Sequence, residues 1–377
     1  MEISRKQKLE EHDLRLNHFF KIKNILNNKV ATTPTHPNFG LTYNMSVGSS
    51  LNDATEQQWI IYPVDGNRYI LANRLTGTVA TVSPEHLNPD NMLTEFYTGY
   101  NGQYWLAQKI QNSNYKLKNN LTGKVATISK DGPNANNMIT DASGNGLEQQ
   151  WALERVEDFL LPDTPSLATD AGPVPRYETG QETLPKTTPK KLVGYTLVPA
   201  VMVKDNDWDP AYQINESPYY ILKRYQYWLR LIDTPIDPLT STKTHYSYGI
   251  ETDKQVTNEQ TIGFSISTDA GMNFKAGTSN KDTGATSEFG VTSDIKQQFH
   301  QELKMTISTT NKQMESYSVE KEVVNPYRQA IQYAKYILAT DLELYRYSKG
   351  SESLVMTTSF SDQTYIKSTS YPFQINE

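Results

Sequence analysis

Three short stretches place a glutamine two residues before a tryptophan: "EQQW" at Glu56–Trp59, "GQYW" at Gly102–Trp105 and "EQQW" at Glu148–Trp151. The tryptophans stand at positions 59, 105 and 151, so both intervals are 46 residues, and they are three of the five in the chain. Three copies of a unit this long predict a closed threefold arrangement rather than an open solenoid, which would need capping repeats.

A second repeated phrase, Val-Ala-Thr, follows a tight turn in each copy. The turns fall at Asn27-Asn28, Thr76-Gly77 and Thr122-Gly123, where Asn and Gly accept the positive φ of a hairpin. Residues i and i+2 of a strand face the same way, so the glutamine and tryptophan of each motif are expected to point inward together. The expected scaffold residues are Gln57, Trp59, Gln103, Trp105, Gln149 and Trp151.

These motifs resemble the ricin-type β-trefoil, whose signature is three Gln-x-Trp motifs, over about residues 15–156. The resemblance implies shallow sites for galactose-like sugars, built from an early Asp, a stacking aromatic residue and a late Asn or Gln. This chain has Lys-Asn or Ala-Asn at the early position, and its third copy lacks an aromatic residue in the intervening loop. The glycan-binding candidates are Asn24, Tyr43, Asn73, Phe96 and Tyr97.

Composition narrows the classes of partner and activity. The net charge is −6 without a Lys/Arg cluster, so nucleic acid is not an expected partner, and the absence of cysteine removes thiol metal sites and disulfides. An acidic stretch, Asp205, Asp207, Asp209 and Glu216, follows a calcium-loop spacing but carries Pro210 where such a loop needs Gly. The sequence therefore predicts no metal, no cofactor and no catalytic residues, hence no enzyme.

The composition changes after the third tryptophan. The stretch from Phe159 to Lys191 contains six prolines and few apolar residues, which is typical of an extended connector. We therefore expect a lectin-like trefoil domain with a short N-terminal extension over 1–156, a connector over 157–191 and a second domain over 192–377.

Three stretches of the second domain resemble the Bin/Tpp family of bacterial insecticidal crystal proteins, which includes the two subunits of a mosquito-larvicidal binary toxin. They are "LVGYTLVPAVMVKD" from Leu192, "SPYYILKRYQYWLRL" from Ser217 and "LELYRY" from Leu342. The resemblance implies an all-β fold: an N-terminal β-trefoil followed by an elongated, aerolysin-like β-sheet domain that forms membrane pores.

An alternating segment near 260–296 is the candidate for membrane insertion. From Ile262 the sequence reads as one arm through Ala276, then a polar stretch, then a second alternating arm from Ala285. Each arm reaches the 9–11 residues that a transmembrane β-strand needs, although an ordinary amphipathic hairpin shows the same alternation. The candidate lipid-facing residues are Ile262, Phe264, Ile266, Ala270, Met272, Phe274, Phe289, Val291 and Ile295.

The first functional hypothesis is an insecticidal pore-forming protoxin. The family resemblance implies a protein stored as a parasporal crystal in the bacterial cytoplasm, trimmed by proteases and active at the insect gut epithelium. A charged N-terminal stretch without an apolar signal core agrees with cytoplasmic synthesis. The cleavage candidates are Arg5, Lys8, Arg15, Lys349 and Lys367.

The expected partners are target-cell glycans or a glycoconjugate receptor, membrane lipid after activation, and further copies of the chain, because a closed barrel leaves no unpaired backbone in lipid. Binary toxins need two chains, so a second toxin subunit is a further candidate partner. Two alternatives remain open: a carbohydrate-binding module attached to a glycoside hydrolase, and a non-lytic lectin or crystal protein.

Overall fold

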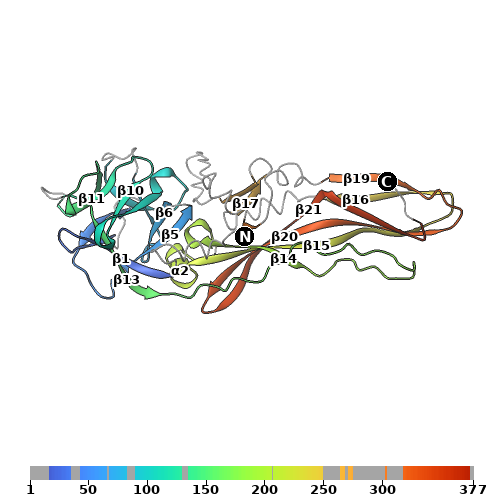
Figure 1. Cartoon of the computed structure of the whole chain (residues 1–377), viewed down its shortest axis with the longest axis horizontal. Coiled ribbons are helices and arrows are strands. Elements are labelled where there is room, and N and C mark those ends of the chain that lie inside the picture. The colour runs from blue at the N-terminus through green and yellow to red at the C-terminus, as the bar shows by residue number, and fades with distance from the viewer. Residues whose placement is uncertain are drawn as a thin grey trace.

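The computed structural model describes residues 17–34, 43–65, 68–82, 90–129, 135–205, 207–248, 264–267, 271–274, 302–303 and 317–373. These residues form an all-β molecule with a rounded head at one end and a long, narrow tail (Figure 1). The tail strands reach 18 to 21 residues. At about 3.3 Å per residue, such strands span roughly 60–70 Å.

The head is a six-stranded barrel closed by three hairpins. The pairings β1–β5, β5–β6, β6–β9, β9–β10, β10–β13 and β13–β1 complete a ring. The ring strands are β1 (His18–Asn24), β5 (Trp59–Asp65), β6 (Arg68–Asn73), β9 (Trp105–Lys109), β10 (Tyr115–Asn119) and β13 (Trp151–Asp158). The capping strands are β2 (Val30–Thr32), β3 (Tyr43–Asn44), β4 (Ser46–Gly48), β7 (Val79–Val82), β8 (Met92–Glu95), β11 (Val125–Ile128) and β12 (Met138–Asp141). This arrangement is the expected β-trefoil.

The threefold symmetry is visible in the strand register. Each motif tryptophan pairs with an asparagine of a neighbouring ring strand: Trp59 with Asn73, Trp105 with Asn119, and Trp151 with Asn24. The predicted turns are confirmed, since Asn28, Gly77 and Gly123 have φ values of 58°, 70° and 69°. Within its described residues the head also contains the 3₁₀ turns η1 (Thr55–Gln57), η2 (Asn101–Gln103), η3 (Gln111–Ser113) and η5 (Leu147–Gln149).

The tail is built on one antiparallel sheet in the order β14-β15-β20-β21. Its strands are β14 (Lys191–Pro199), β15 (Tyr219–Ile236), β20 (Ile331–Ser348) and β21 (Ser351–Tyr371). A 3₁₀ turn, η6 (Ala200–Met202), and a short helix, α2 (Pro210–Glu216), lie between β14 and β15 at the end nearest the head. The sheet therefore runs lengthwise away from the trefoil.

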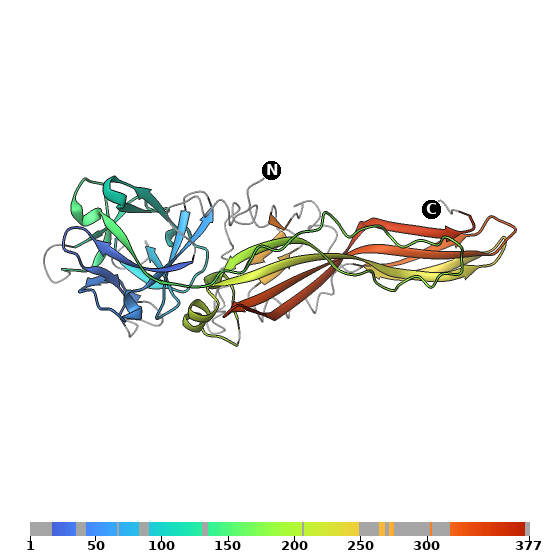
Figure 2. The same cartoon turned by 60° about the horizontal axis from the view of Figure 1, so that its bottom comes forward.

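The proline-rich segment 159–190 forms no regular strand and runs along the tail before it returns to β14 (Figure 2). It packs on one face of the sheet through a cluster that includes Tyr177, Leu184, Trp228 and Tyr336. The indole Nε1 of Trp228 donates to the Gly172 carbonyl at 2.9 Å, and the Tyr336 hydroxyl donates to the Pro185 carbonyl at 2.7 Å. The expected connector is thus also a strap that covers the sheet.

A two-stranded ribbon, β16 (Ser241–Tyr248) with β19 (Tyr317–Val324), lies over the opposite face of the distal sheet (Figure 1). Two further strands, β17 (Phe264–Ser267) and β18 (Gly271–Phe274), pair with each other. Both strands fall within the arm through 262–276 that the sequence predicts for membrane insertion, and most of the remaining insertion segment lies outside the described residues.

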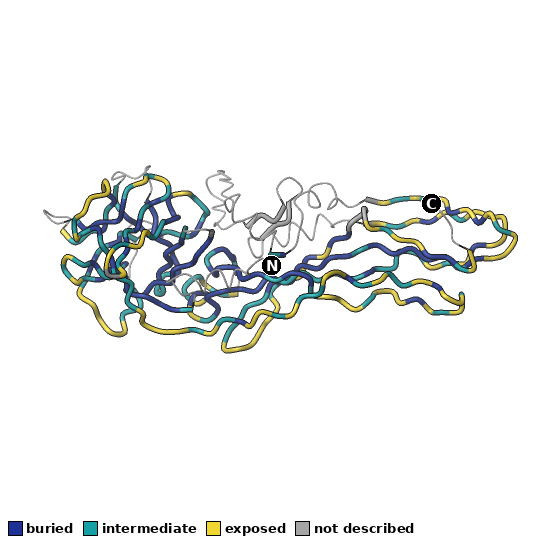
Figure 3. The backbone as a smooth tube through the Cα atoms, viewed as in Figure 1, coloured by how far each residue is buried: buried dark blue, intermediate teal, exposed yellow. Residues whose placement is uncertain are grey.

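Buried residues form a continuous spine from the head into the tail (Figure 3). One core lies inside the trefoil around its three tryptophans. A second core extends across the head–tail junction and contains Tyr62 and Val64 of the head together with Val198, Ile214 and Tyr220 of the tail. Head and tail are therefore joined by packed side chains as well as by the chain itself.

Candidate functional site

The Gln-x-Trp residues hold the trefoil together. Each indole Nε1 donates to an alanine carbonyl of a Val-Ala-Thr phrase, at 3.1 Å for Trp59 and 3.0 Å for Trp105 and Trp151. Each glutamine amide bridges two backbone groups, as Gln57 does with the Ser49 carbonyl and the Leu51 N–H, both at 2.9 Å. All six side chains are buried, so the structure places them in the scaffold.

Three of the glycan-binding candidates are also buried and already bonded. Asn24 and Asn73 are fully buried, donate to backbone carbonyls of a neighbouring copy and accept from the N–H groups of their own turns. Tyr97 is 4% exposed, and its hydroxyl lies 2.6 Å from that of Tyr104. Burial raises the pKa of Tyr97 well above its ordinary value, with the neighbouring Tyr104 adding to the shift. None of these three side chains faces the solvent.

The two remaining glycan-binding candidates lie near each other along the β3–β8 contact. Tyr43 pairs with Thr94 in the β3–β8 contact, and Phe96 follows the end of β8 by one residue. Both are half-buried, and they come from different copies of the repeat. Aromatic faces of this kind can receive the C–H surface of a sugar. The structure therefore brings Tyr43 and Phe96 into one area and leaves Asn24, Asn73 and Tyr97 out of it.

The head meets the tail through aromatic residues. Tyr62 of β5 is fully buried, and its hydroxyl donates to the Pro218 carbonyl at 2.9 Å. Its ring contacts the Tyr219 ring edge-on with centroids 5.2 Å apart, and Phe159 contacts both Tyr219 and Phe19. Burial raises the pKa of Tyr62 well above its ordinary value, with Tyr219 contributing. Burial at the junction therefore favours the uncharged phenol of Tyr62.

The turn of the second copy is covered by helix α2. A Cβ added at Gly77 would lie 2.4 Å from the carbonyl carbon of Pro210, so the two backbones are in close contact. Beside it, Arg74 Nε donates to Asn215 Oδ1 at 2.8 Å, and Asn215 Nδ2 donates back to the Arg74 carbonyl at 3.1 Å. The equivalent Gly123 of the third copy meets only the end of a lysine side chain at 3.8 Å. Only one of these two similar turns is used for docking.

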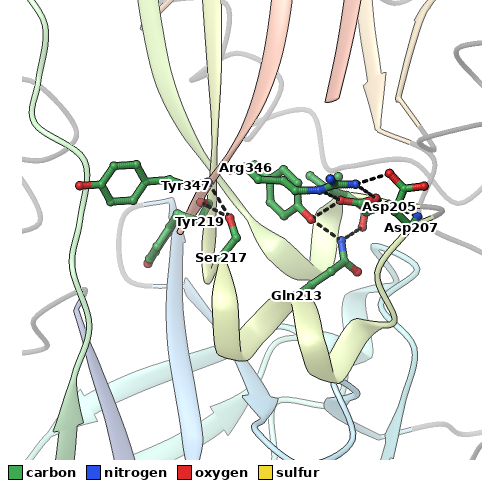
Figure 4. A network of polar contacts seen from close by, with 9 residues as sticks. Asp205, Asp207, Gln213, Ser217, Tyr219, Arg346 and Tyr347 are labelled. Atoms are coloured by element: carbon green, nitrogen blue, oxygen red, sulfur yellow. Dashed lines mark hydrogen bonds and ion pairs between the residues drawn. The ribbon is translucent and has the colours of Figure 1, made fainter. Parts of the chain in front are cut away.

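Behind α2, Arg346 of β20 binds two aspartates of the preceding loop (Figure 4). Its Nε and Nη2 donate to the two carboxylate oxygens of Asp205, both at 2.6 Å, and Nη2 also donates to Asp207 at 2.7 Å. The Tyr220 hydroxyl donates to Asp205 at 2.7 Å and accepts from Gln213 of α2 at 3.0 Å. A bidentate guanidinium–carboxylate pair of this kind fixes orientation as well as distance.

Electrostatics favour the charged form of this pair. Burial alone would raise the pKa of Asp205, but hydrogen bonds from Arg346 and Tyr220 outweigh it and hold that pKa below its ordinary value. The pKa of Arg346 is raised, chiefly by its bond to Asp205. The carboxylates of the calcium-like spacing are thus bound to protein groups, and the described residues contain no group of three or more acidic or histidine side chains that could hold a metal ion. Asp209 instead caps α2 by accepting from the Tyr212 N–H at 2.8 Å.

A second pair of buried carboxylates lies along β20. Asp341 and Glu343 are 3% and 8% exposed, and both bind Lys190 of the strap, at 2.6 and 2.9 Å. The glycoside-hydrolase alternative requires two opposed carboxylates in the C-terminal half. This pair stands on one strand and both carboxylates bind the same lysine, which is a structural arrangement.

The membrane-insertion candidates lie mostly outside the described residues. Phe264 and Ile266 belong to β17, and Met272 and Phe274 belong to β18, where they pair as Phe264 with Phe274 and Ile266 with Met272. The other candidates, Ile262, Ala270, Phe289, Val291 and Ile295, are not described. The helices of the described part of the chain are all too short or too polar to span a membrane.

The cleavage candidates differ in accessibility. Lys349 occupies the turn between β20 and β21 with φ of 51°, its side chain is 84% exposed, and it pairs with Glu216 at 3.1 Å. Lys367 is exposed but lies inside β21, paired with Tyr336, so a protease would first have to open the strand. Arg5, Lys8 and Arg15 fall outside the described residues.

The sequence already contained a sign of the docking face. Strand β5, "WIIYPVD", has apolar side chains on both faces, as a strand buried on both sides requires. At the position three after the tryptophan, β5 carries Tyr62, whereas the equivalent positions in β9 and β13 carry Gln108 and Glu154. That contrast alone would have marked the outer face of β5 as the one covered by another part of the molecule.

The head and tail together define a class of all-β proteins in which a β-trefoil is fixed to one end of an elongated sheet domain. A family model described as "Insecticidal Crystal Toxin, P42" matches residues 191–363. Insecticidal crystal protein Cry35Ab1 of Bacillus thuringiensis is 38% identical over 58% of this chain and 55% of its own length. Binary larvicide subunit BinA of Lysinibacillus sphaericus is 30% identical over 43% of this chain and 40% of its own.

In these alignments the chain spans about half the length of the curated relatives it matches, or less. The crystal structure of Cry35Ab1 superposes with a TM-score of 0.79 at 32% identity and covers 95% of this chain and 91% of the other. The chain belongs to the family of bacterial insecticidal crystal toxins that contains Cry35 and the Bin subunits, as the sequence resemblance had implied.

Proposed function

We propose that this chain is an insecticidal pore-forming protoxin whose trefoil binds glycans on gut cells and whose tail inserts β-hairpins into the membrane as an oligomer. The observation that carries the proposal is the β16–β19 ribbon, in which Tyr248 pairs with Tyr317. This pairing brings together the two ends of the segment that contains all the insertion candidates. A segment whose ends are already antiparallel can extend as one hairpin without new chain crossings.

The proposal keeps the other expectations of the sequence: storage as a crystal in the bacterial cytoplasm, cleavage near the chain ends, and no enzymatic role. A relative is named a binary larvicide subunit, which supports a second chain as a partner for this one. Lys349 is the favoured site of cleavage within the described residues, because it is the candidate that lies exposed in a turn.

Dye release from vesicles of gut-membrane lipid tests the insertion step. The protease-treated chain is expected to release the dye, alone or with a partner subunit. Ile266→Asp would place a charge among the candidate lipid-facing residues and should abolish release, since a charge on the lipid-facing side of a barrel strand destabilises insertion. Ser265→Asp, on the other face of the alternation, is the matched control and should retain release. Intact vesicles under every condition would overturn the pore proposal.

Glycan binding is proposed for the surface formed by Tyr43 and Phe96 at the β3–β8 contact. A Tyr43→Ala/Phe96→Ala variant should lose at least tenfold in affinity on a glycan array, because each ring offers a stacking face. Leu121→Ala, at the exposed turn of the third copy, is the control and should bind normally. Equal binding by the double variant and the unmodified chain would exclude this surface.

A further inference from the structure

Asn325 occupies the distal tip of the tail and is fully buried. Its side-chain Nδ2 lies within hydrogen-bond distance of three backbone carbonyls, those of Ile236 at 3.1 Å, Asp237 at 2.9 Å and Gln329 at 2.8 Å. Its Oδ1 accepts from the Tyr327 N–H at 3.0 Å. One amide side chain therefore satisfies several backbone groups that lie about 90 residues apart in the sequence.

These partners are the two connections that join the ribbon to the sheet. Residues 237–240 lead from β15 into β16, and residues 325–330 lead from β19 into β20. The connections are also joined directly, since the Asn325 N–H donates to the Thr240 carbonyl at 2.8 Å and the Leu239 N–H donates to the Tyr327 carbonyl at 3.0 Å. At this point both strands reverse, so that the ribbon folds back over the sheet (Figure 1).

The strands on the two sides of this reversal are in compatible register. Ile236 pairs with Ile331 at the end of the sheet, and Ser241 pairs with Val324 at the start of the ribbon. Between these two pairs, the segment that joins β15 to β16 advances five residues, from 236 to 241. The segment that joins β19 to β20 advances seven residues, from 324 to 331. The difference is two residues, which preserves the alternation of side chains. If the reversal straightened, β15–β16 and β19–β20 could form one long antiparallel pair with a single two-residue bulge.

The contact beneath the ribbon is a small apolar core that buries one hydroxyl without a partner among the described residues. Its apolar core among the described residues consists of Ile236, Val323, Ile331 and Tyr333. The Tyr333 hydroxyl is buried and has no hydrogen-bond partner in the described part of the chain. Lys335 is 1% exposed, with its ammonium nitrogen 5.3 Å from the centre of the Tyr246 ring of the ribbon. Release of the ribbon would return the Tyr333 hydroxyl to water, which offsets part of the lost apolar burial.

We infer that Asn325 is the hinge residue that holds the β16–β19 ribbon folded on the tail, and that its bonds break when the ribbon swings out to extend the β15–β20 pair. The inference rests on the proposed pore function, because the ribbon connects the insertion segment to the body. Asn325 is a positioning residue in this scheme and need not contact lipid.

Hydrogen exchange of the full-length chain in solution tests the hinge without a membrane. In Asn325→Ala, amides of 241–248 and 317–324 should exchange at least tenfold faster, while amides of β15 and β20 keep their protection. Asn119→Ala removes a comparable set of bonds from a fully buried asparagine in the trefoil and should leave the ribbon unchanged. Uniform acceleration throughout the tail, or none, would overturn the hinge.

Spin labels give the direction of the movement. The chain has no cysteine, so Lys243→Cys on the ribbon and Lys367→Cys on β21 place two labels without background. A longer distance population should appear in the hinge variant in solution, and in the otherwise native chain after protease treatment with gut-lipid vesicles. A longer distance without dye release would support the hinge and count against the pore. Dye release with an unchanged distance would support the pore and overturn the hinge.

Discussion

Two internal interfaces of this molecule have opposite character. The head–tail junction is a large apolar core that contains the hydrogen-bonded hydroxyls of Tyr62 and Tyr220 and the Asp205–Arg346 ion pair, although the Tyr195 hydroxyl beside it has no partner among the described residues. The ribbon–sheet contact is smaller in the described residues and buries the unbonded Tyr333 hydroxyl and the Lys335 ammonium. The first has the features of a permanent joint and the second those of a releasable one.

This difference shows how one chain can be rigid in one place and convertible in another. A large packed core that is also fixed by a buried ion pair costs much free energy to separate, whereas a small apolar contact costs less. The head then moves with the proximal sheet as one body, whereas the ribbon can leave the distal sheet. Variants at both interfaces should separate these two behaviours.

The largest effect is expected for Tyr62→Ala at the junction. The change removes a fully buried aromatic ring and leaves the Pro218 carbonyl without its donor, so the free energy of unfolding should fall by about 3–5 kcal/mol. Gln108→Ala, at the equivalent exposed position of β9, should stay within about 0.5 kcal/mol. Urea denaturation followed by tryptophan fluorescence measures both. Similar values for the two variants would show that the junction is not a packed core.

Arg346→Met should lower the free energy of unfolding by about 3 kcal/mol, because it leaves the buried Asp205 carboxylate without its cation. The pKa of Asp205 is lowered in the folded state, so the pair contributes stability above the ordinary aspartate pKa of about 4 and loses it as pH falls below that value. The variant should therefore lose less stability than the native chain between pH 5 and pH 3. An Asp205→Asn/Arg346→Met chain should recover part of the loss, and no recovery would mean that the cost is one of packing.

Gly77→Ala and Gly123→Ala compare the docked turn with its undocked counterpart. Both place a Cβ at positive φ, which costs about 1–2 kcal/mol. Only the first also forces that Cβ against the Pro210 backbone, which should add about 1–3 kcal/mol. Limited proteolysis of 159–190 should accelerate in Gly77→Ala alone, since that segment begins beside the junction. Equal losses of stability and equal proteolysis rates in the two variants would mean that helix α2 moves away from the added Cβ without a loss of stability.

The sequence predicted the head far better than the joints. The trefoil follows from three motifs of fixed spacing, because the tryptophan–alanine and glutamine–backbone bonds recur in each copy. The burial of the outer face of β5 could also be predicted, because the strand carries apolar residues on both faces. The role of Asn325 could not be predicted from the sequence, because its carbonyl partners at Ile236 and Asp237 lie 89 and 88 residues away. A lone asparagine after a strand is also typical of any turn.

The glycan candidates show the same limit. Asn24 and Asn73 stand near the early sugar-binding position of ricin-type trefoils. In the structure, however, both are buried and form hydrogen bonds between copies of the repeat. Position along the repeat was predictable, whereas exposure was not.

The smallest effect is expected at the releasable interface, where Lys335 makes ribbon docking depend on pH. Burial, with a contribution from nearby Lys321, lowers the pKa of Lys335 to about 8 in the docked state. Once exposed, the amine would return to its ordinary pKa of about 10.4, so the released state binds more protons between these values and docking strengthens as pH rises. Between pH 8 and pH 9.5 the free energy of ribbon opening should increase by about 1–2 kcal/mol, measured by hydrogen exchange corrected for the intrinsic rate at each pH.

The Lys335→Met variant should lose this increase. The Lys367→Met variant, which changes an exposed lysine on β21, should keep it. If Lys335→Met keeps the increase, Lys335 does not cause the pH dependence of ribbon docking.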